Sequence, residues 1–452
     1  MRKISPTLFA TKTLCSALLA ASLAQPACAI DYGIYDARAL AMGGTTLAVG
    51  NTAQGQYYNP ALLAFHKGDE DKTRDGRTYF PTMVVQATDT VDSAVNAVDD
   101  ELDTKLSNAV NAYNALRTAA SAGAVATSAQ DLRKVLDDIA NKDVTINGFF
   151  GLSVSEPSDH EGGAFYLGAR VIGAGTSKIT GSDLSLLDEY ITAMNQLAGG
   201  ANPLTVAAEH PKLVNADGTL KDPTATLSSS ADVSALAISE WGMAMGKEFT
   251  FWGQAVSLGV TPKLMRVDAY RDDANFNTTT VTSVNDTLNQ FSDTKSTHIT
   301  LNADVGVAAI IAEHYRVGIA VKDVIAKDFT THQEADPVTG VARPDLVVKL
   351  RPRSRMGVGY VAENFSIGLD YDLKESTPIA NEAPNQDVTL GAEYTFFDTL
   401  ALRVGYRQDR TGFHENATSA GIGVHWARFV MDIAYSQSSE MKAGGLQMGW
   451  TF

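Results

Sequence analysis

The chain has 452 residues, with 36 Lys and Arg against 52 Asp and Glu and a net charge of -16 at neutral pH. Because nucleic-acid binding depends on cationic contacts to phosphates, this acidic balance excludes nucleic acid as an expected partner. Both cysteines, Cys15 and Cys28, lie in the first 29 residues, so residues 30–452 can hold no disulfide, thiol nucleophile or cysteine metal site.

Residues 1–29 have the pattern of a secretory signal peptide. Three basic residues precede the short apolar run LCSALLAASLA, and a small-x-small site follows at Ala27-Cys28-Ala29. The run is too short to span a bilayer. A lipoprotein signal needs small or apolar residues before the cysteine, and Gln25-Pro26 do not fit. We expect Sec-type cleavage near Ala29, which leaves 33 Lys and Arg against 52 Asp and Glu, a net charge of -19.

Residues 36–64, DARALAMGGTTLAVGNTAQGQYYNPALLA, lack the alternation of a strand. Their glycines allow backbone turns that other residues resist, and Tyr57-Tyr58 with Leu62, Leu63 and Phe65 provide surface to bury. Such a segment is expected to fold rather than stay extended.

A first strand is expected near Thr78–Thr88, and helical spacing follows it. Apolar residues recur three and four apart at Val95, Val98, Leu102, Leu106, Ala109, Tyr113 and Leu116. A second such stretch, SDLSLLDEYITAMNQLAGG, opens with Ser182 as an expected N-cap and stops at Gly199-Gly200. We expect helical insertions at about 89–143 and 175–230. They form either a cap packed on its own apolar faces, or a mobile lid or partner-binding arm.

The second half of the chain alternates with a period of two. QDVTLGAEYTFF places Leu390 and Tyr394 on an apolar face, with Thr389 and Glu393 on the other, and five further segments repeat the rule. A soluble sandwich would also alternate. Strands near ten residues with aromatic ends favour a barrel. No run after residue 29 reaches the roughly 20 apolar residues of a membrane-spanning helix.

Tight links such as WARF, FFDT, AENF and AEHY alternate with long ones at 271–295, 323–345, 373–387 and 407–416. Short turns on one side and long loops on the other are typical of outer-membrane barrels. The fold expected for residues 78–452 is therefore an all-β transmembrane barrel of about 14 antiparallel strands, in the outer membrane of a Gram-negative cell and in contact with its lipid. An even strand count leaves both termini on the periplasmic side.

Ahead of such a barrel, residues 30–77 can stay free in the periplasm or enter the lumen. We expect the second, an N-terminal lumenal hatch.

Charged residues are expected to face the lumen. They are Lys349, Arg351, Arg353 and Arg355, which we assign to one strand, and Asp370, Asp372, Glu393, Arg403 and Arg407 on nearby strands. They form either a paired ion network or a binding site for an anionic head group.

The segment 36–64 resembles the hatch signature of FadL/OmpP1/TodX-type outer-membrane barrels, in which an MGG run leads to an aromatic residue and then Asn-Pro-Ala. Met42, Gly43 and Gly44 match the first block, and Asn59, Pro60 and Ala61 match the second. The rest of the chain is similar to barrels of this clan labelled conjugal-transfer protein TraF. The final LQMGWTF resembles the signal read by the barrel-assembly machinery. The resemblance implies a monomeric barrel whose hatch takes part in passing hydrophobic molecules.

Three classes of function follow. The first is hatch-gated passage of small hydrophobic or amphipathic solutes. The second is a TraF-like structural or interaction component of a conjugative envelope apparatus, with conjugation proteins as partners. The third is an outer-membrane hydrolase. The sequence around His298, His314 and His425 shows no recognisable spacing to a serine nucleophile, which argues against this class. We therefore expect no enzyme activity, no cofactor and no metal site.

Overall fold

The computed structural model describes residues 30–65, 76–91, 102–140, 142–251, 253–275, 294–331, 346–376 and 383–452. The predicted signal peptide lies outside these residues, as do Val95 and Val98 of the first helical pattern.

Fourteen antiparallel strands close into a barrel in the order β1-β16-β15-β14-β13-β12-β11-β10-β7-β6-β5-β4-β3-β2, which confirms the predicted fold class. The strands are β1 (Arg77–Thr88), β2 (Asp143–Glu156), β3 (Glu161–Lys178), β4 (Ser230–Phe251), β5 (Gln254–Asn275), β6 (Ser296–Ile311), β7 (Tyr315–Lys322), β10 (Arg353–Val361), β11 (Phe365–Asp372), β12 (Asp387–Phe396), β13 (Leu400–Asp409), β14 (Ala417–Trp426), β15 (Phe429–Gln437) and β16 (Met441–Thr451). Each strand pairs with its neighbours along the chain except where β8 and β9 intervene, and β16 returns to β1.

The predicted faces of the strands are confirmed in the register of β12. Leu390 is 44% exposed on the outer surface, whereas Thr389 is 1% exposed on the inner one. Exposed aromatic side chains gather near the strand ends on the short-turn side: Phe249, Phe251, Tyr315, Phe365, Tyr394, Phe396, Trp426, Trp450 and Phe452. Tyr406 and Tyr435 lie toward the other end. An apolar exterior edged by aromatic residues suits strands that cross a membrane, because closure leaves no unpaired backbone in lipid.

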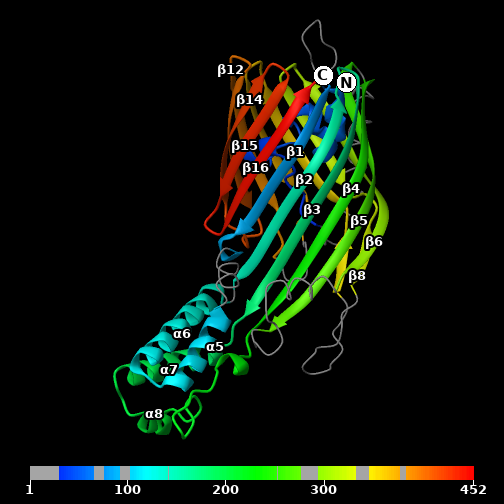
Figure 1. Cartoon of the computed structure of the whole chain (residues 1–452). Coiled ribbons are helices and arrows are strands. Elements are labelled where there is room, and N and C mark those ends of the chain that lie inside the picture. The colour runs from blue at the N-terminus through cyan, green and yellow to red at the C-terminus, as the bar shows by residue number, and fades with distance from the viewer. Residues whose placement is uncertain are drawn as a thin grey trace, which may run out of the picture.

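The short turns lie at one end of the barrel, together with the C-terminus and the start of β1, except for the three-residue turn between β15 and β16, which lies at the opposite end (Figure 1). The long connections all leave from the opposite end, which we call the long-loop end. There β3, β4, β5 and β6 run on beyond the others, with 18, 22, 22 and 16 residues against 8 to 10 in β7 and β10–β15. The barrel therefore continues outward as a half-wall on one side.

A two-stranded hairpin, β8 (Lys327–Thr331) and β9 (Leu346–Leu350), pairs with itself alone and contacts β5 and β6. It covers an apolar cluster on the inside of the half-wall. The cluster consists of Ile30, Ile172, Leu236, Ile238, Met265, Val267, Ala269, Phe329, Val348 and Leu350. The half-wall thus shelters apolar surface at the long-loop end of the lumen.

The two insertions fold together into one helical domain, which projects from the long-loop end (Figure 1). Its helices are α5 (Leu102–Leu116), α6 (Ala119–Ile139), α7 (Gly181–Ala198) and α8 (Pro203–Glu209). Leu106 of α5, Val125 of α6 and Leu187 of α7 belong to a single buried cluster, so the domain has its own core. None of the described helices is long and apolar enough to cross a membrane.

The N-cap of α7 is Thr180, whose hydroxyl accepts a hydrogen bond from the amide of Asp183, and not the predicted Ser182. Threonine and serine hydroxyls can both cap a helix. The N-cap residue must itself have a non-helical backbone, and Thr180 is extended whereas Ser182 is already helical.

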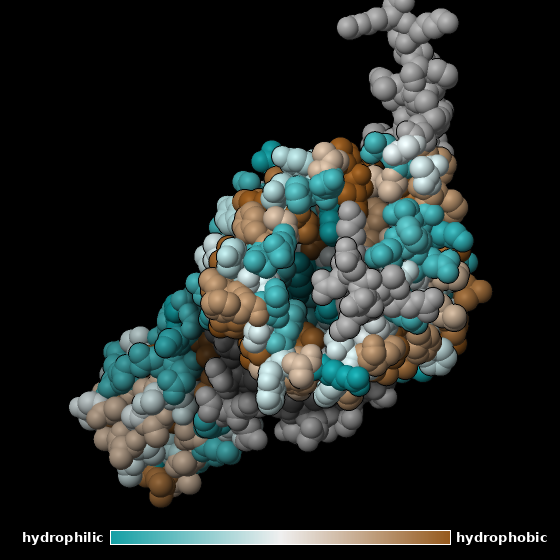
Figure 2. All heavy atoms as spheres, turned by 90° about the horizontal axis from the view of Figure 1, so that it is seen from above, coloured by the Kyte–Doolittle hydropathy of each residue, from teal (hydrophilic) through white to brown (hydrophobic). Residues whose placement is uncertain are grey.

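Residues 30–65, which we call the N-terminal segment, lie inside the barrel as short helical turns. They are α2 (Ala37–Ala41), a 3-10 turn at Thr52–Gln54, α3 (Gly55–Tyr58) and a 3-10 turn at Pro60–Ala64. Every residue from 35 to 50 is buried. Viewed from the short-turn end, hydrophilic residues line a hollow within the ring of the barrel (Figure 2).

Candidate functional site: the filled lumen

The predicted motif residues set the backbone of the N-terminal segment. Gly43 and Gly44 adopt positive φ values of +68° and +96°, which let the chain turn after α2. Asn59 caps the turn at Pro60–Ala64, because its side-chain oxygen accepts a hydrogen bond from the amide of Ala61 at 3.1 Å. Pro60 occupies the first helical position, where its fixed φ fits. Met42 is fully buried.

Glycines on the inner face of the wall let this segment come into backbone contact with the strands. A Cβ atom at Gly405 of β13 would lie 2.1 Å from the amide nitrogen of Gly43. One at Gly259 of β5 would lie 2.2 Å from the amide nitrogen of Ala61. Sequence reasoning missed these positions, although their signal is present as inward glycines in the middle of alternating strands.

Polar contacts also fix the N-terminal segment to strands around the whole ring. Asp370 of β11 accepts hydrogen bonds from the amides of Thr46 and Leu47, at 2.6 and 2.9 Å. Single side-chain contacts add to this: Ser155 to the Ala53 carbonyl, Ser257 to the Ala61 carbonyl, Ser419 to the Ala41 carbonyl, Thr45 to Thr389, and Asn59 to the Val307 carbonyl.

A chain of charges crosses the lumen at α2. Arg38 donates to both oxygens of Glu393, at 2.9 and 3.0 Å, and Arg403 shares that carboxylate. Arg403 also pairs with Asp432 at 2.6 Å. Gln447 then donates to Asp432. Each buried charge has an opposite partner, as burial demands.

Arg353 and Arg355 of β10 share Asp372 of β11, and Arg355 also donates to the carbonyl of Gly44. Arg353, Arg355 and Asp372 thus form a paired ion network, one of the two alternatives for the lumen charges, and Arg355 links this network to the N-terminal segment. Arg353 is 2% exposed, yet its Nε and Nη1 have no hydrogen-bond partner among the described residues. The Arg353 guanidinium therefore has N–H groups that make no hydrogen bond with the described residues.

Lys349 and Arg351 do not share the strand of Arg353, so their assignment to one inward-facing strand is wrong. Lys349 is an exposed residue of β9, and Arg351 lies after β9 and pairs with Asp328. Pro352 separates the two strands. Arg407 lies on β13 and is half-buried.

Two buried lysines were not predicted. The Nζ of Lys263 lies 3.1, 3.0 and 2.8 Å from carboxylate oxygens of Glu240, Asp304 and Asp323. Lys322 donates to the hydroxyl of Tyr35 and the carbonyl of Tyr57. Each is an isolated lysine at an inward position, Lys263 on β5 and Lys322 on β7. The alternation of the strands could have shown that these side chains point into the lumen, but not what they contact there.

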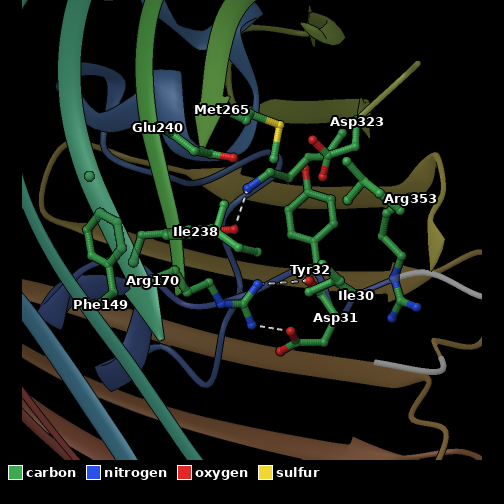
Figure 3. A pocket seen from close by; sticks show the side chains of 14 residues that line it. Ile30, Asp31, Tyr32, Phe149, Arg170, Ile238, Glu240, Met265, Asp323 and Arg353 are labelled. Carbon is green, nitrogen blue, oxygen red and sulfur yellow. Dashed lines mark hydrogen bonds and ion pairs between the residues drawn. The ribbon is translucent and has the colours of Figure 1, made fainter. Parts of the chain in front are cut away.

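A small cavity lies between the N-terminal segment and the apolar cluster beneath the β8–β9 hairpin (Figure 3). Its volume is about 20 Å³, room for one water molecule. Apolar walls come from Ile30, Ile238, Met265 and Leu350, which all line it. Its charged walls are the cations Lys322, Arg353 and Arg170 and the carboxylates Asp31, Glu240 and Asp323, of which Asp31 pairs with Arg170. The cavity thus joins an apolar side to a side that carries both cations and carboxylates.

Within the described residues no group of three or more His, Cys, Asp and Glu side chains is arranged to hold a metal ion.

Fold and site together define a closed β-barrel whose lumen is filled by its own N-terminal segment. The sequence matches the family described as "F plasmid transfer operon, TraF, protein" over residues 56–372. The chain belongs to this family. The match includes Asn59, Pro60 and Ala61 and starts after Met42, Gly43 and Gly44. No curated protein sequence matches the chain.

Several solved structures have a similar fold at low sequence identity. The "TodX monoaromatic hydrocarbon channel deltaS2 mutant" is 11% identical, with 92% of this chain and 97% of that chain covered and a TM-score of 0.46. The "CymD monoaromatic hydrocarbon channel" is 11% identical, with 94% and 99% covered and a TM-score of 0.45. A Pseudomonas aeruginosa FadL homologue is 9% identical, with 94% and 99% covered and a TM-score of 0.48.

Proposed function

We propose that the protein is an outer-membrane barrel that passes small amphipathic molecules with an anionic end, and that the N-terminal segment is its hatch. The observation that carries this proposal is the cavity on the long-loop side of that segment. Arg353, whose Nε and Nη1 have no partner among the described residues, is part of its lining, and residues of the apolar cluster under the hairpin form another part. Arg favours carboxylate and phosphate groups, while the apolar cluster suits a hydrocarbon tail.

A solute larger than water cannot fit the cavity as it stands. Passage therefore requires the hatch or the β8–β9 hairpin to move. The hairpin contacts the barrel wall but pairs with no barrel strand, so its displacement breaks no barrel hydrogen-bond ladder. The hatch, by contrast, is held by polar contacts on many strands, and its movement is the step that gates the lumen.

A reversible tether tests the gate. The hydroxyls of Thr45 in the hatch and Thr389 in β12 lie 3.0 Å apart, so a cysteine at each position can form a disulfide. Residues 30–452 contain no other cysteine. We expect proteoliposomes with the oxidised Thr45→Cys/Thr389→Cys protein to admit no octanoate, and reduction to restore influx. Each single variant is the matched control, insensitive to oxidation. Equal influx in the oxidised and reduced double variant would contradict the gate.

The family description favours a second function, a component of a conjugative envelope apparatus. The helical domain suits it, because it projects from the barrel with its own core and exposes Leu116 and Leu204, at 67% and 60%. If the domain docks a conjugation protein, replacing both leucines by Glu lowers mating frequency and leaves octanoate influx unchanged. Unchanged mating would argue against this role. Absence of enzyme activity and contact with the barrel-assembly machinery also remain predictions.

A further inference from the structure

A second cavity lies at the short-turn end of the lumen, on the other side of the N-terminal segment from the cavity of Figure 3. It has a volume of about 240 Å³ and is formed by the starts of β1, β7 and β11 and by the segment around Asn51. Liquid water takes about 30 Å³ a molecule, so this space can hold a group much larger than a single water. The hollow in Figure 2 is at this end.

Four arginines and three carboxylates are among the residues that line it. Arg38, Arg77, Arg316 and Arg403 line it, against the carboxylates of Glu363, Glu393 and Asp432. Arg38 forms an ion pair with Glu393, and Arg403 forms ion pairs with both Glu393 and Asp432. Glu363 lies exposed in the turn between β10 and β11.

Of the other two arginines, Arg77 donates a hydrogen bond to the hydroxyl of Tyr79, and Arg316 is left. It is half-buried at the start of β7, and within the described parts of the chain no carboxylate forms an ion pair with it and its buried Nε has no hydrogen-bond partner. Arg38 acts on it as a like charge. Two guanidinium groups close to each other repel, and an anion that joins them relieves this repulsion.

A second unused donor lines the same space. Ser366 of β11 is 6% exposed, and its hydroxyl has no partner among the described residues. Arg316 and Ser366 both occupy inward positions, and only β10 lies between their strands. Neighbouring strands are about 4.8 Å apart, and Ser366 lies two residues along β11 from the position level with Arg316, so the two backbone positions are roughly 12 Å apart. An arginine side chain and one oxyanion can bridge this gap.

We infer that this cavity is a binding site for a phosphate group, held by Arg316 and Ser366 and reached from the short-turn end of the barrel. A guanidinium supplies two parallel donors and the hydroxyl a third, which suits the several oxygens of a phosphate. The same chemistry can come from a soluble phosphate or from a lipid head group. This inference does not rest on the proposed transport.

The test uses the whole refolded barrel with calorimetry in two arms. One arm titrates inorganic phosphate into protein in detergent, and the other measures binding of a short-chain phosphatidic acid. Binding in the first arm alone identifies a soluble source, and binding in the second alone identifies a lipid head group. Either result supports the phosphate site, and no binding in both arms overturns it.

Variants locate the site. Arg316→Gln should weaken binding about tenfold or more, since a hydrogen bond to a charged group contributes roughly 1.5–3 kcal/mol. Arg316→Lys should retain part of the affinity, and Ser366→Ala should weaken binding less than Arg316→Gln. The matched control is Arg351→Gln, which removes an arginine at the opposite end of the barrel. Heat-modifiable gel mobility reports that each barrel is folded. Equal affinity in Arg316→Gln and the parent protein would place phosphate elsewhere.

Discussion

Arg38 in the N-terminal segment and Glu393 in β12 form a two-pronged ion pair, with N–O distances of 2.9 and 3.0 Å across 355 positions of sequence. Both side chains are largely buried. Glu393 also accepts Arg403, which ties the pair to the charges of β13 and β15. This contact is therefore a natural place to loosen the N-terminal segment without touching the outer surface of the barrel.

Replacing Arg38 by Gln should make the closed lumen leak. The substitution removes one of two guanidinium groups from Glu393 and the donor to the Val49 carbonyl, at a cost of roughly 1–3 kcal/mol in seating the segment. Planar-bilayer recordings should show more frequent openings, with heat-modifiable mobility retained. The control is Arg266→Gln, because Arg266 is half exposed and pairs within β5. An unchanged opening frequency in Arg38→Gln would show that this pair does not hold the segment.

Gly43 and Gly44 offer a matched pair. Both have positive φ, so alanine is strained at either position, but a Cβ at Gly43 would also lie 2.8 Å from the amide nitrogen of Tyr406 in β13. At Gly44 the nearest atoms are 3.6 Å away. Gly43→Ala should therefore raise conductance more than Gly44→Ala, both in barrels that still fold. Equal conductance would mean that backbone strain, and not the close approach to β13, decides the effect.

The barrel itself could be predicted because its main signals are local. Alternation placed Leu390 outward and Thr389 inward, and the turn lengths gave the two ends of the barrel. The resemblance of the chain to barrels labelled conjugal-transfer protein TraF is confirmed by the family match over residues 56–372.

Long-range and topological details could not be predicted in the same way. Alternation runs through Val348-Lys349-Leu350 and on into β10, so it cannot distinguish one strand from two, and only Pro352 marked the break. The partner of Arg38 lies more than 300 residues away, and no periodicity relates the two. Lys263 and Lys322 were missed for the same reason, because burial of a lone charge depends on carboxylates and carbonyls from other strands.

The outward face of β12 gives a prediction about membrane insertion. Leu390→Arg should lower the free energy of folding into lipid by about 2–4 kcal/mol if the site lies near the midplane of the bilayer, because the charge must enter hydrocarbon. Refolding into vesicles measures this loss. Ser439→Arg, in the exposed turn between β15 and β16, introduces the same side chain outside the apolar belt and should fold like the parent. Similar losses in both variants would contradict the assigned faces.

Asp183, in the first turn of α7, is the most heavily hydrogen-bonded carboxylate of the helical domain's described residues. It is 3% exposed and accepts bonds from the amides of Ser228 and Ser229, at 2.9 and 2.6 Å, and from both hydroxyls. Burial alone raises the pKa of this carboxyl, but the bonds from Ser229 and Ser228 outweigh it, and the pKa is lowered from its ordinary value. A helix N-terminus also favours a negative charge.

Because the pKa of Asp183 is lower in the folded domain than in the unfolded chain, its contribution to stability is complete above the unfolded pKa of about 4 and is lost as the pH falls through the folded value. Asp183→Asn should lower the stability of the helical domain by about 2 kcal/mol at neutral pH and by less below about pH 4. Thermal melts followed by helical circular dichroism measure this difference. Asp188→Asn, in the same helix, breaks only a half-exposed pair with Arg133 and should cost at most about 1 kcal/mol. If Asp183→Asn lowered the stability of the helical domain equally at both pH values, the charge of Asp183 would not be the source of its contribution.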